Sequence, residues 1–573
     1  MTENLTITTE RVDDIPLLLA QMKQMDLPHL FDSYFPIHGN WQGLDAGWTA
    51  TMWLAHILSQ ADHRLSYVQP WAAGHLRTLQ QASGHPVRAL DFSDDRLASL
   101  LRYFSADQSW AGFEAALNRR LVRVYDFSAT QVRLDSTTAS GYWAVDDAGL
   151  FQLGHSKDKR PDLAQLKVML ASLDPLPLPL VTHVLPGYAA DDPLYCPAIR
   201  AVRASLGRRG LLYVGDSKMA ALATRAYVQA GGDFYLMPLP APHLPADWQT
   251  AYLGPVHAAT APLRTVQRQR LDGDVVDIAV GYECTEAVSA TYETQALQWP
   301  ERRLVVRSLS AAKSAEQRLR KRLALAEAAL RALNARGRGK KRPADRAALE
   351  HAIAAIGAQY HVEGLVRVDL SEHWHQRSVR AYKGRAGRSE QQWDFSLGVE
   401  RDEAALQRTI AGLGWQVYAT NRPSSELSLE QAVLCYREEY LIEQSFGRLK
   451  GAPLSVSPFY LHRDDHAKGL VRLLSVAVRV LALVECVVRR RLAADGAELA
   501  GLYAGQPQAG TRRPTTERLL ESFRGVTLTI IQQADQVVLH VTPLSDLQRR
   551  ILELLGFSVD IYRGLVLASM NPP

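Results

Sequence analysis

The stretch LCYREEYLIEQSFGRLK, residues 434–450, determines how the rest of the chain is interpreted. It contains no proline, and its one glycine is near the end, which is typical of a helix. At about 100° per residue, an apolar stripe separates from a polar face. The stripe contains Cys435, Ile442, Phe446 and Leu449, and the polar face contains Tyr436, Glu439, Tyr440, Glu443, Gly447 and Lys450. Because a charged helix face is usually only solvated, a chemical role for Glu443 and Lys450 depends on acidic residues elsewhere in the chain.

The length and composition indicate a soluble globular protein with several domains. A chain of 573 residues is too long for one hydrophobic core, and at about 150 residues per domain it predicts three or four domains, or one large domain with an insertion. Hydrophobic residues make up 47% and charged residues 22% of the chain, which is ordinary for globular proteins. The four cysteines are far apart and show no CxxC spacing, which argues against a zinc site or a disulfide framework.

The sequence shows neither a membrane span nor a secretion signal. No uncharged apolar run reaches the roughly 18 residues of a transmembrane helix. The nearest run, residues 470–488, is interrupted by Arg472, Arg479 and Glu485 and is predicted to be a buried helix. The N-terminus lacks the basic-then-apolar order of a signal peptide. We therefore expect a cytoplasmic protein without a membrane partner.

Basic residues are concentrated in one part of the chain. The net charge of +5 is modest, but residues 301–346 contain fifteen Lys or Arg and four Asp or Glu. A nucleic-acid backbone is the partner that this excess favours. The alternative is a basic surface without a polyanionic partner.

The first half of the chain changes from a helical pattern to a mixed one. Residues 1–120 are predicted to be mostly helical, and a helical module before a catalytic domain is a common arrangement for DNA recognition. The helices are expected at residues 15–25, 44–60, 68–81 and 96–105. Short β-prone runs separated by helices then predict a mixed sheet flanked by helices. Strands are expected at 131–138, 166–173, 211–216 and 233–237, a further strand pair at 142–153, and helices at 193–206 and 217–230.

Between about residues 245 and 410 this rhythm breaks, and we interpret the region as an insertion. Its expected strands are 275–282, 303–308, 366–370, 378–382 and 393–399, and its expected helices are 310–336 and 345–359. A strand at 415–420 then precedes the stretch at 434–450. The C-terminal region is predicted to contain a long apolar helix at 467–492, a strand at 536–541 and a helix at 545–555 with Ser545 as its N-cap.

Two acidic residues upstream give Glu443 a context. Asp135 is in a predicted strand, and Asp216 is at the end of another. A carboxylate at the edge of a core is costly unless it is paired or binds a metal. Three such groups that converge on one cleft would suit Mg²⁺, and two ions about 4 Å apart would support in-line phosphoryl displacement. Each aspartate alone is weak support; the combination is what favours a site.

Four motifs in this order resemble the DDE transposases of bacterial insertion sequences. The motifs are LDSTTASGY at 134–142, GHSKDKRPDLAQLKVML at 154–170, LLYVGDSKM at 211–219 and YREEYLIEQSFGRLK at 436–450. The resemblance is to the IS4-type superfamily and most closely to its IS1634-type branch. The N-terminal segments HGNWQG and SQADHRLS also match that branch. Because these segments are spread along the chain, the resemblance covers most of it.

The resemblance implies an α/β fold with an RNase H-like catalytic domain. This domain would be a mixed five-stranded sheet flanked by helices and interrupted by a large α+β insertion. The expected divisions are a helical DNA-binding or dimerisation domain at 1–125, the first part of the core at 126–244, the insertion at 245–410, the second part of the core at 411–465, and a helical C-terminal region with a tail at 466–573.

The resemblance also implies roles for individual residues. Asp135, Asp216 and Glu443 would be the catalytic carboxylates and the ligands of Mg²⁺, or of Mn²⁺ in its place, with two ions bound. Lys450 and Tyr436 would bind a DNA phosphate, with Tyr440 and Arg437 beside them. The family has an arginine where this chain has Glu439, so Glu439 is either a bystander or an added negative charge, and whether this copy is active stays open.

Other DNA contacts are expected outside that stretch. His155, Lys157, Lys159 and Arg160 form a basic turn that is either a contact with DNA near the element end or a solvated turn. Related enzymes stack an aromatic residue of the insertion on a base displaced from the duplex, and Trp299 is the candidate here, against a core or surface tryptophan.

The implied function is that of a Mg²⁺-dependent transposase. It would bind the terminal inverted repeats of its own element, cut the DNA there, and join the freed 3′-OH to target DNA. Its partners would be double-stranded DNA and a second copy of the chain in a homodimer, in a bacterial cytoplasm and associated with the nucleoid. The alternatives are a metal-dependent nuclease of the same fold and a non-catalytic DNA-binding protein descended from a transposase.

Overall fold

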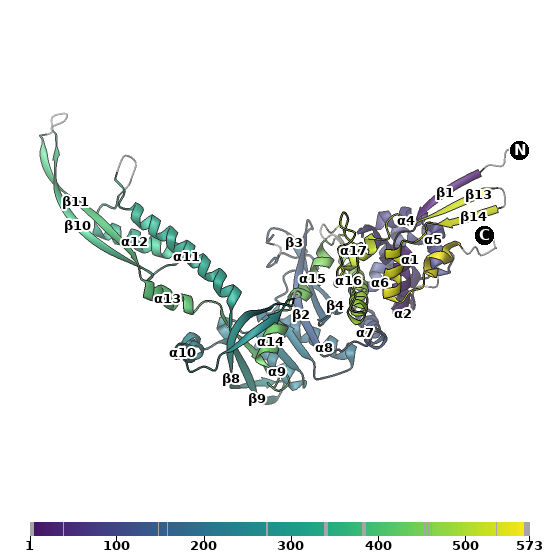
Figure 1. Ribbon diagram of the computed structural model, residues 1–573, viewed down its shortest axis with the longest axis horizontal. Helices are drawn as coiled ribbons and strands as arrows, with labels where there is room; N and C mark the ends of the chain where they lie inside the picture. The colour runs from purple at the N-terminus through teal and green to yellow at the C-terminus, as the bar shows by residue number, and fades with distance from the viewer. Residues whose placement is uncertain are drawn as a thin grey trace. The chain divides into compact units, whose positions relative to one another are not determined.

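The structure is a computed structural model that describes residues 5–37, 39, 41–146, 148–157, 159–270, 273–336, 342–380, 386–451, 454, 456, 459, 461–533 and 536–566, without the side chains of residues 379 and 390. The chain forms two compact units. Unit 1 consists of Met1–Met237, Val288–Trp299 and Cys435–Pro573, and unit 2 of Pro238–Ala287 and Pro300–Leu434. Figure 1 labels their helices and strands.

The N-terminal part of unit 1 is a cluster of helices packed on aromatic residues. It contains α1 (Ile15–Gln24), α2 (Leu27–Tyr34), α3 (Ala46–Gln60), α4 (Leu65–Ala73), α5 (Leu76–Ser83), η1 (Ala89–Phe92), α6 (Asp94–Ser105) and α7 (Asp107–Val124). The predicted helices at 15–25, 44–60 and 96–105 are confirmed. The one predicted at 68–81 is two helices, because α4 ends at Gly74. Phe31 and Phe113 stack in the core with their centroids 4.7 Å apart.

Five neighbouring strands of a nine-stranded mixed sheet form the centre of unit 1, so the sheet is larger than the five strands expected from the sequence. The five strands are β2 (Gln131–Gly141), β3 (Ala164–Leu173), β4 (Leu178–Pro186), β5 (Leu212–Gly215) and β6 (Phe234–Pro238), in the order β4-β3-β2-β5-β6. Neighbours β4, β3 and β2 are antiparallel, whereas β2, β5 and β6 are parallel. The connections contain η2 (Asp192–Leu194), α8 (Tyr195–Leu206), η3 (Ser217–Ala220) and α9 (Leu222–Ala230). The α/β class and the predicted strands at 131–138, 166–173, 211–216 and 233–237 are therefore confirmed.

The strand pair predicted at 142–153 is wrong for the described part of that segment, which excludes residue 147. Its one β-contact is an isolated bridge between Gln152 and Gln165. The segment instead forms hydrogen bonds with residues about 300 positions later in the chain. Trp143 Nε1 donates to the carbonyl of Leu461 at 3.0 Å, and the Leu150 amide donates to Asp464 at 2.8 Å. A contact made so far along the chain has no local signal in the sequence.

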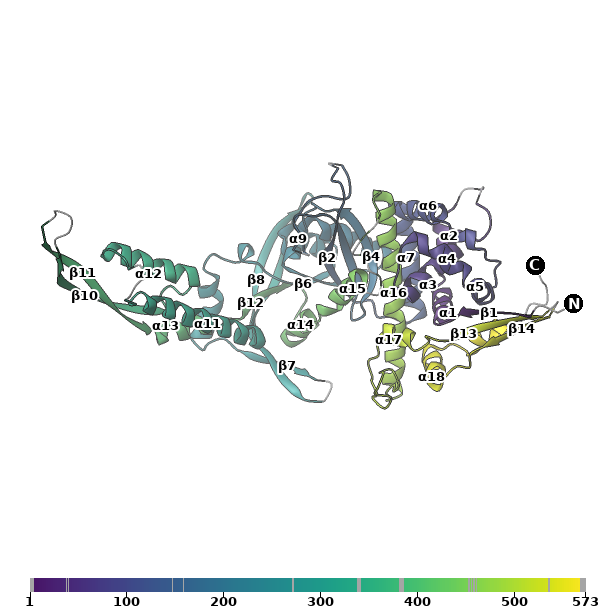
Figure 2. The ribbon, with the colours of Figure 1, turned by 90° about the horizontal axis from the view of Figure 1, so that it is seen from above.

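The helix α16 (Asp464–Ala494) is the central element of the C-terminal part. It is buried along most of its length, as predicted for residues 470–488, and Figure 2 shows it between β4 and the N-terminal helices, among them α6. It is followed by α17 (Thr516–Glu521), β13 (Thr527–Gln533), β14 (Gln536–Val541), α18 (Asp546–Leu555), α19 (Asp560–Arg563) and η6 (Gly564–Val566). Ser545 caps α18 as predicted, by accepting a hydrogen bond from the amide of Gln548. Within the described residues, no helix is both long and apolar enough to cross a membrane.

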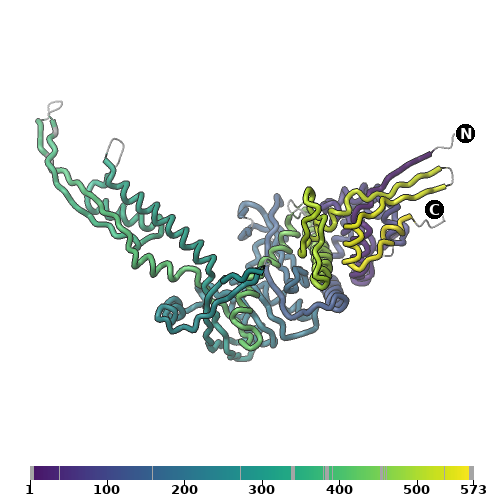
Figure 3. The backbone as a smooth tube through the Cα atoms, viewed as in Figure 1, coloured from purple at the N-terminus to yellow at the C-terminus, as the bar shows by residue number. Residues whose placement is uncertain are grey.

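A strand near the N-terminus and two strands near the C-terminus form one sheet in unit 1. The strand β1 (Leu5–Arg11) pairs antiparallel with β13, and β13 pairs with β14 to form a three-stranded sheet (Figure 3). The sequence did not predict β1. Its side chains are almost all exposed, so the apolar periodicity that identifies a buried strand is weak there.

Unit 2 contains several helices and strands, two of which form a long hairpin. Its elements are η4 (Ala241–His243), η5 (Gln249–Leu253), α10 (Gly254–His257), β7 (Arg264–Gln269), α11 (Leu309–Ala332), α12 (Arg346–Tyr360), β10 (Val366–Val379), β11 (Arg388–Arg401), α13 (Glu403–Ala411), β12 (Trp415–Thr420) and most of α14 (Leu429–Tyr436), with parts of β8 (Val275–Tyr292) and β9 (Gln295–Ser308). The predicted segments 366–370 and 378–379 are one continuous strand, β10, because every residue pairs with β11; residues 381 and 382 lie outside the described residues.

Buried ion pairs fix the helix α15 (Tyr440–Lys450) to the core of unit 1. Arg448 contacts Glu485 on α16 at 2.5 Å and Glu517 on α17 at 2.9 Å, and the side chains of Arg448 and Glu485 are each 4% exposed. A buried charge that loses its partner is strongly destabilising. These ion pairs therefore help to determine where Glu443, the acidic residue of α15, lies.

We predict that Arg448→Met lowers the free energy of unfolding by about 3 kcal/mol, because Glu485 loses its buried partner and keeps only the ion pair with Arg489. The matched control is Arg549→Met, which removes an exposed arginine paired with Asp546 and should cost less than about 1 kcal/mol. Urea-induced unfolding measures both. Equal, small losses in the two variants would contradict the role given to Arg448.

Candidate active site

Asp135 of β2 and Asp216, which directly follows β5, are neighbours across two parallel strands. Leu134 of β2 pairs with Gly215 of β5, so the next residues of the two strands are the two aspartates. Ligands of α/β sheets bind at the carboxyl ends of parallel strands. The structure thus brings together two acids that are 81 positions apart in the sequence.

Asp216 is held by donors of its own unit. Its Oδ1 accepts hydrogen bonds from the Tyr195 hydroxyl at 2.5 Å and from the Lys218 amide at 2.9 Å. Burial and the charge of Asp216 raise the pKa of Tyr195 well above its usual value. Tyr195 therefore remains protonated and stays a donor to Asp216.

Asp135 has one cation beside it. Its Oδ1 accepts hydrogen bonds from the Ser136 amide at 2.7 Å and from Lys157 Nζ at 3.1 Å. The same ammonium group donates to the carbonyl of Ser136. Burial raises the pKa of Asp135, Lys157 lowers it and Asp216 raises it, with a net upward shift. The contact with Lys157 therefore does not fully offset the effects of burial and of Asp216 on the Asp135 carboxylate.

The stretch at 434–450 is two helices rather than the single helix that its composition predicts. The helix α14 ends at Tyr436 and α15 begins at Tyr440. At the break, the amides of Glu438 and Glu439 donate to carbonyls three residues back, at 3.2 Å each. Arg133 donates to one of these acceptors, the carbonyl of Cys435. A competing donor from β2 at this point explains why the helix is interrupted.

The break brings Glu439 towards the two aspartates. A small pocket at this position is lined by Arg133, Leu134, Asp135, Val214, Gly215, Asp216, Tyr436, Glu439 and Ile442. Burial raises the pKa of Glu439, and the charges of Asp135, Glu443 and Asp216 raise it further. Glu443 is exposed on the first turn of α15. Glu439 is therefore a member of the acidic cluster and not a bystander, which the sequence left open.

The other residues named from the sequence are on the same unit but in different settings. Tyr436 lines the pocket, Arg437 is half-buried at the helix break, Tyr440 is exposed, and Lys450 is the half-buried last residue of α15. Lys159 and Arg160 are exposed, and Arg160 is paired with Asp162 at 2.7 Å.

Trp299 does not lie at the surface. It is 3% exposed, and its Nε1 donates to the hydroxyl of Tyr235 at 2.8 Å. This is the setting of a core tryptophan whose polar atom is satisfied. Stacking on a DNA base would require Trp299 to leave the core.

Two residues near the cluster, Tyr195 and Lys167, were not identified as site residues from the sequence. Tyr195 binds Asp216, and Lys167 contacts Asp191 at 2.8 Å, which in turn accepts a hydrogen bond from Ser136 at 2.8 Å. A lysine within the apolar strand LKVMLASL was a usable signal, since a buried lysine must be paired. No sequence pattern pointed to Tyr195.

The donor set suits a hard divalent cation. Carboxylate oxygens are the ligands that Mg²⁺ prefers. The acids of this cluster repel one another, and Lys157 is the cation in contact with Asp135. Within the described part of the chain, no three acidic, His or Cys side chains form a closed metal site as they stand. Asp135 and Asp216 fit such an ion, and a third ligand would have to come from the junction of α14 and α15.

Comparison with known proteins shows a distant structural likeness but no match in sequence. No family model matches the chain, and no curated protein matches its sequence. Among solved structures, the chain is similar to piggyBac transposase in a synaptic complex with hairpin DNA, with a TM-score of 0.31 and 8% sequence identity, over 99% of this chain and 89% of that chain. A likeness at this level establishes neither the fold nor the function of this chain.

We predict that Glu439→Gln raises the thermal midpoint at neutral pH and that the gain shrinks towards about pH 4. A raised carboxyl pKa means that the folded state binds the proton more tightly than the unfolded state, so stability falls as pH rises from the usual value towards the folded pKa. Removing the carboxylate removes this loss. Thermal unfolding at both pH values measures it.

Glu430→Gln is the matched control, since the pKa of Glu430 on α14 is lowered and its removal should give no such gain. A midpoint of Glu439→Gln below that of the wild type at neutral pH would show that Glu439 stabilises the fold and does not repel its neighbours.

Proposed function

We propose that this protein is a DNA transposase with an RNase H-like catalytic core that cuts and joins DNA. The observation that carries the proposal is the pairing of β2 with β5, which brings Asp135 and Asp216 together in one pocket with Glu439. The order β4-β3-β2-β5-β6, with antiparallel pairs on one side of β2 and parallel pairs on the other, supports the RNase H-like core. The four motifs of the sequence support the transposase class, of the IS4 type and IS1634-type branch.

Asp135 and Asp216 would hold Mg²⁺, or Mn²⁺ in its place, and Glu443 would complete the ligand set. In both aspartates the donors described above bind Oδ1, which fixes the carboxylate and leaves Oδ2 for an ion. When bound, two such ions supply Lewis acidity at the attacking and leaving oxygens of an in-line displacement at phosphorus. Tyr195 orients Asp216, and Lys157 keeps the charge of Asp135 partly compensated.

The reaction needs no covalent intermediate with the protein. Water would attack a phosphodiester at the end of the element, the bond from phosphorus to the 3′ oxygen would break, and a free 3′-OH would result. That hydroxyl would then attack a phosphate of the target DNA, so that one phosphodiester bond forms as another breaks and the proton goes to solvent. Lys450 and Tyr436 would bind a phosphate near the cut, Lys450 as a point charge and Tyr436 as a hydrogen-bond donor.

The partners in this proposal are the inverted repeats of the element, target DNA and a second copy of the chain. Arg437 and Tyr440, beside Tyr436, and the exposed Lys159 and Arg160 would add contacts to the DNA backbone. A non-catalytic DNA-binding protein is the second candidate, because the described acids do not form a closed metal site.

We predict that the wild-type protein with Mg²⁺ cuts plasmid DNA that carries the sequences flanking its gene, and joins the cut ends to a target plasmid. Asp216→Asn should lower both steps about a thousandfold or more, equivalent to about 4 kcal/mol of transition-state stabilisation, and retain DNA binding. The control Asp192→Asn changes an exposed aspartate of the same unit and should retain activity. Gel analysis of labelled ends measures cutting and joining.

The other outcomes of this experiment would indicate a different function or contradict the assigned site. Cut ends without joined product would indicate a hydrolytic nuclease. Binding without cutting would indicate the non-catalytic protein. Equal activity of Asp216→Asn and wild type would contradict the site assignment.

A further inference from the structure

The helix α11 carries a row of exposed cations. Lys313, Arg318, Arg320, Lys321 and Arg322 are all exposed. Among residues 309–326, the one acidic residue is Glu316, and it is paired with Arg320 at 2.7 Å. In the part of the chain that the structure describes, the other four cations make no ion pair with an acidic side chain. Their charge is therefore presented to solvent.

The opposite face of α11 fixes which way these cations point. Its residues Leu319, Leu323 and Ala326 are buried in a hydrophobic cluster with Val362, Leu365 and Leu406 of unit 2. Because this stripe faces the interior of unit 2, the arc that contains Lys313, Lys321 and Arg318 faces away from it. The orientation of the cations is set by packing and does not depend on a mobile loop.

The spacing of the cations is unfavourable for the helix itself. Arg318 is four residues before Arg322 and three before Lys321, and like charges at these spacings destabilise a helix. Lys313 and Lys321 are each four residues from Gln317, where a glutamate would pair with both. Because Gln317 is not a glutamate, α11 lacks ion pairs with Lys313 and Lys321 that would stabilise it, and this face of the helix stays positively charged.

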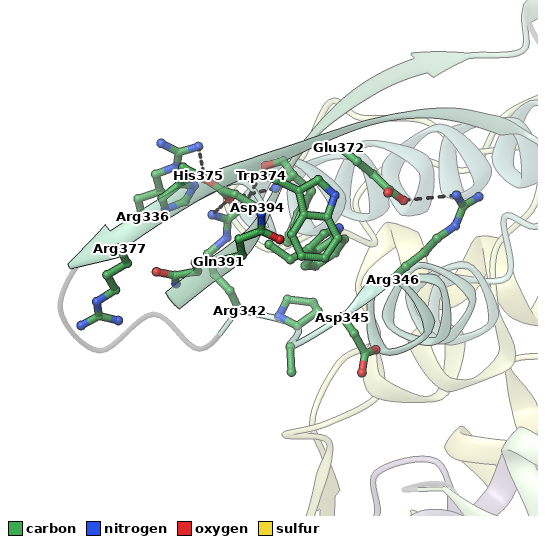
Figure 4. Close-up of a pocket in the computed structure, with 15 residues that line it drawn as sticks. Arg336, Arg342, Asp345, Arg346, Glu372, Trp374, His375, Arg377, Gln391 and Asp394 are labelled. Atoms are coloured by element: carbon green, nitrogen blue, oxygen red, sulfur yellow. Dashed lines mark hydrogen bonds and ion pairs between the residues drawn. The ribbon is translucent and has the colours of Figure 1, made fainter. Parts of the chain in front are cut away.

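A second cationic region of unit 2 shows what compensated charges look like. In the pocket of Figure 4, Arg336 and Arg342 contact Asp394, and Arg346 contacts Glu372 at 3.2 Å. Asp394 is itself buried. These arginines are tied to fixed acids and serve the structure of the hairpin, whereas the four cations of α11 are not.

We propose that the face of α11 formed by Lys313, Arg318, Lys321 and Arg322 binds the phosphate backbone of double-stranded DNA. The inference rests on the proposed function, since that function supplies DNA as the partner. At about 1.5 Å per residue, the four cations extend over roughly 14 Å of helix, which is long enough to contact several phosphates of one strand. The side chains between them include the exposed polar residues Ser314 and Gln317, with no aromatic residue of the kind that anchors a protein partner.

The first test removes the four charges in the full-length protein by Lys313→Gln, Arg318→Gln, Lys321→Gln and Arg322→Gln together. Fluorescence anisotropy with a short duplex of arbitrary sequence gives the affinity at increasing KCl. Each lost phosphate contact lowers the slope of log affinity against log salt by about 0.9. With four contacts removed, we therefore expect a slope smaller by about 3.6 and at least a tenfold weaker complex at low salt.

The matched control removes the same number of positive charges from exposed arginines that are paired with acids. These are Arg346, Arg367, Arg512 and Arg549, each changed to Gln. The slope of this control should stay close to that of the wild type. A slope change in the α11 variant no larger than in the control overturns the inference.

A single substitution separates DNA binding from folding. Gln317→Glu places an acid within reach of both Lys313 and Lys321, so it should keep or raise the thermal midpoint while it weakens DNA binding. Unchanged DNA affinity of Gln317→Glu overturns the inference even if the fourfold variant fails to fold. A loss of binding to polyglutamate without a loss of binding to the duplex also overturns it, and indicates an acidic protein partner.

The inference and the proposed function can fail separately. If the wild type cuts DNA and the α11 variants bind the duplex as the wild type does, the inference fails and the proposed function stands. If the wild type does not cut DNA but the α11 variants lose duplex binding, the proposed function fails and the basic face remains a DNA-binding surface.

Discussion

The candidate site depends on one buried arginine. Arg133 of β2 is paired with Asp174 at 2.6 Å and donates to the Cys435 carbonyl, where α14 ends. Because side chains alternate along a strand, Arg133 and Asp135 are on the same face of β2. One side chain thus connects the strand of the first aspartate with the helix break that brings Glu439 to it. The desolvation of Arg133 is compensated by Asp174, and its position follows from the sheet.

Charge balance separates the parts of the molecule that hold the fold from those that would bind a partner. In the core, Arg448 and Arg479 contact Glu485 and Glu114 at 2.5 Å each, and such pairs are stable only when their partners are complete. The acidic cluster is different, because burial and, to a smaller extent, neighbouring carboxylates raise the pKa of Asp135 and of Glu439. The fold therefore tolerates a concentration of negative charge that a cation would relieve.

The sequence was sufficient for the parts of the fold that have local periodicity. The strands of Asp135 and Asp216 and the buried helix α16 have apolar patterns that define them without a partner. The strand β1 and the loop at 142–153 depend on contacts with segments far along the chain, and these leave no local pattern. The same holds for the break at Glu439: its cause is Arg133, which is about 300 positions away. Trp299 was named as a DNA contact because it lies within the predicted insertion at 245–410, but its hydrogen bond to Tyr235 and its burial place it in the core.

The central claim is that Asp135 and Asp216 bind a divalent cation together with an acid from residues 434–450. Anomalous scattering from crystals grown with Mn²⁺ tests it most directly. The account predicts a peak between the carboxylates of Asp135 and Asp216, at the coordination distance of about 2.0–2.2 Å for small divalent ions, and the third ligand would show whether Glu443 or Glu439 completes the site. The absence of such a peak at saturating Mn²⁺, in crystals where both aspartates are ordered, would contradict the account.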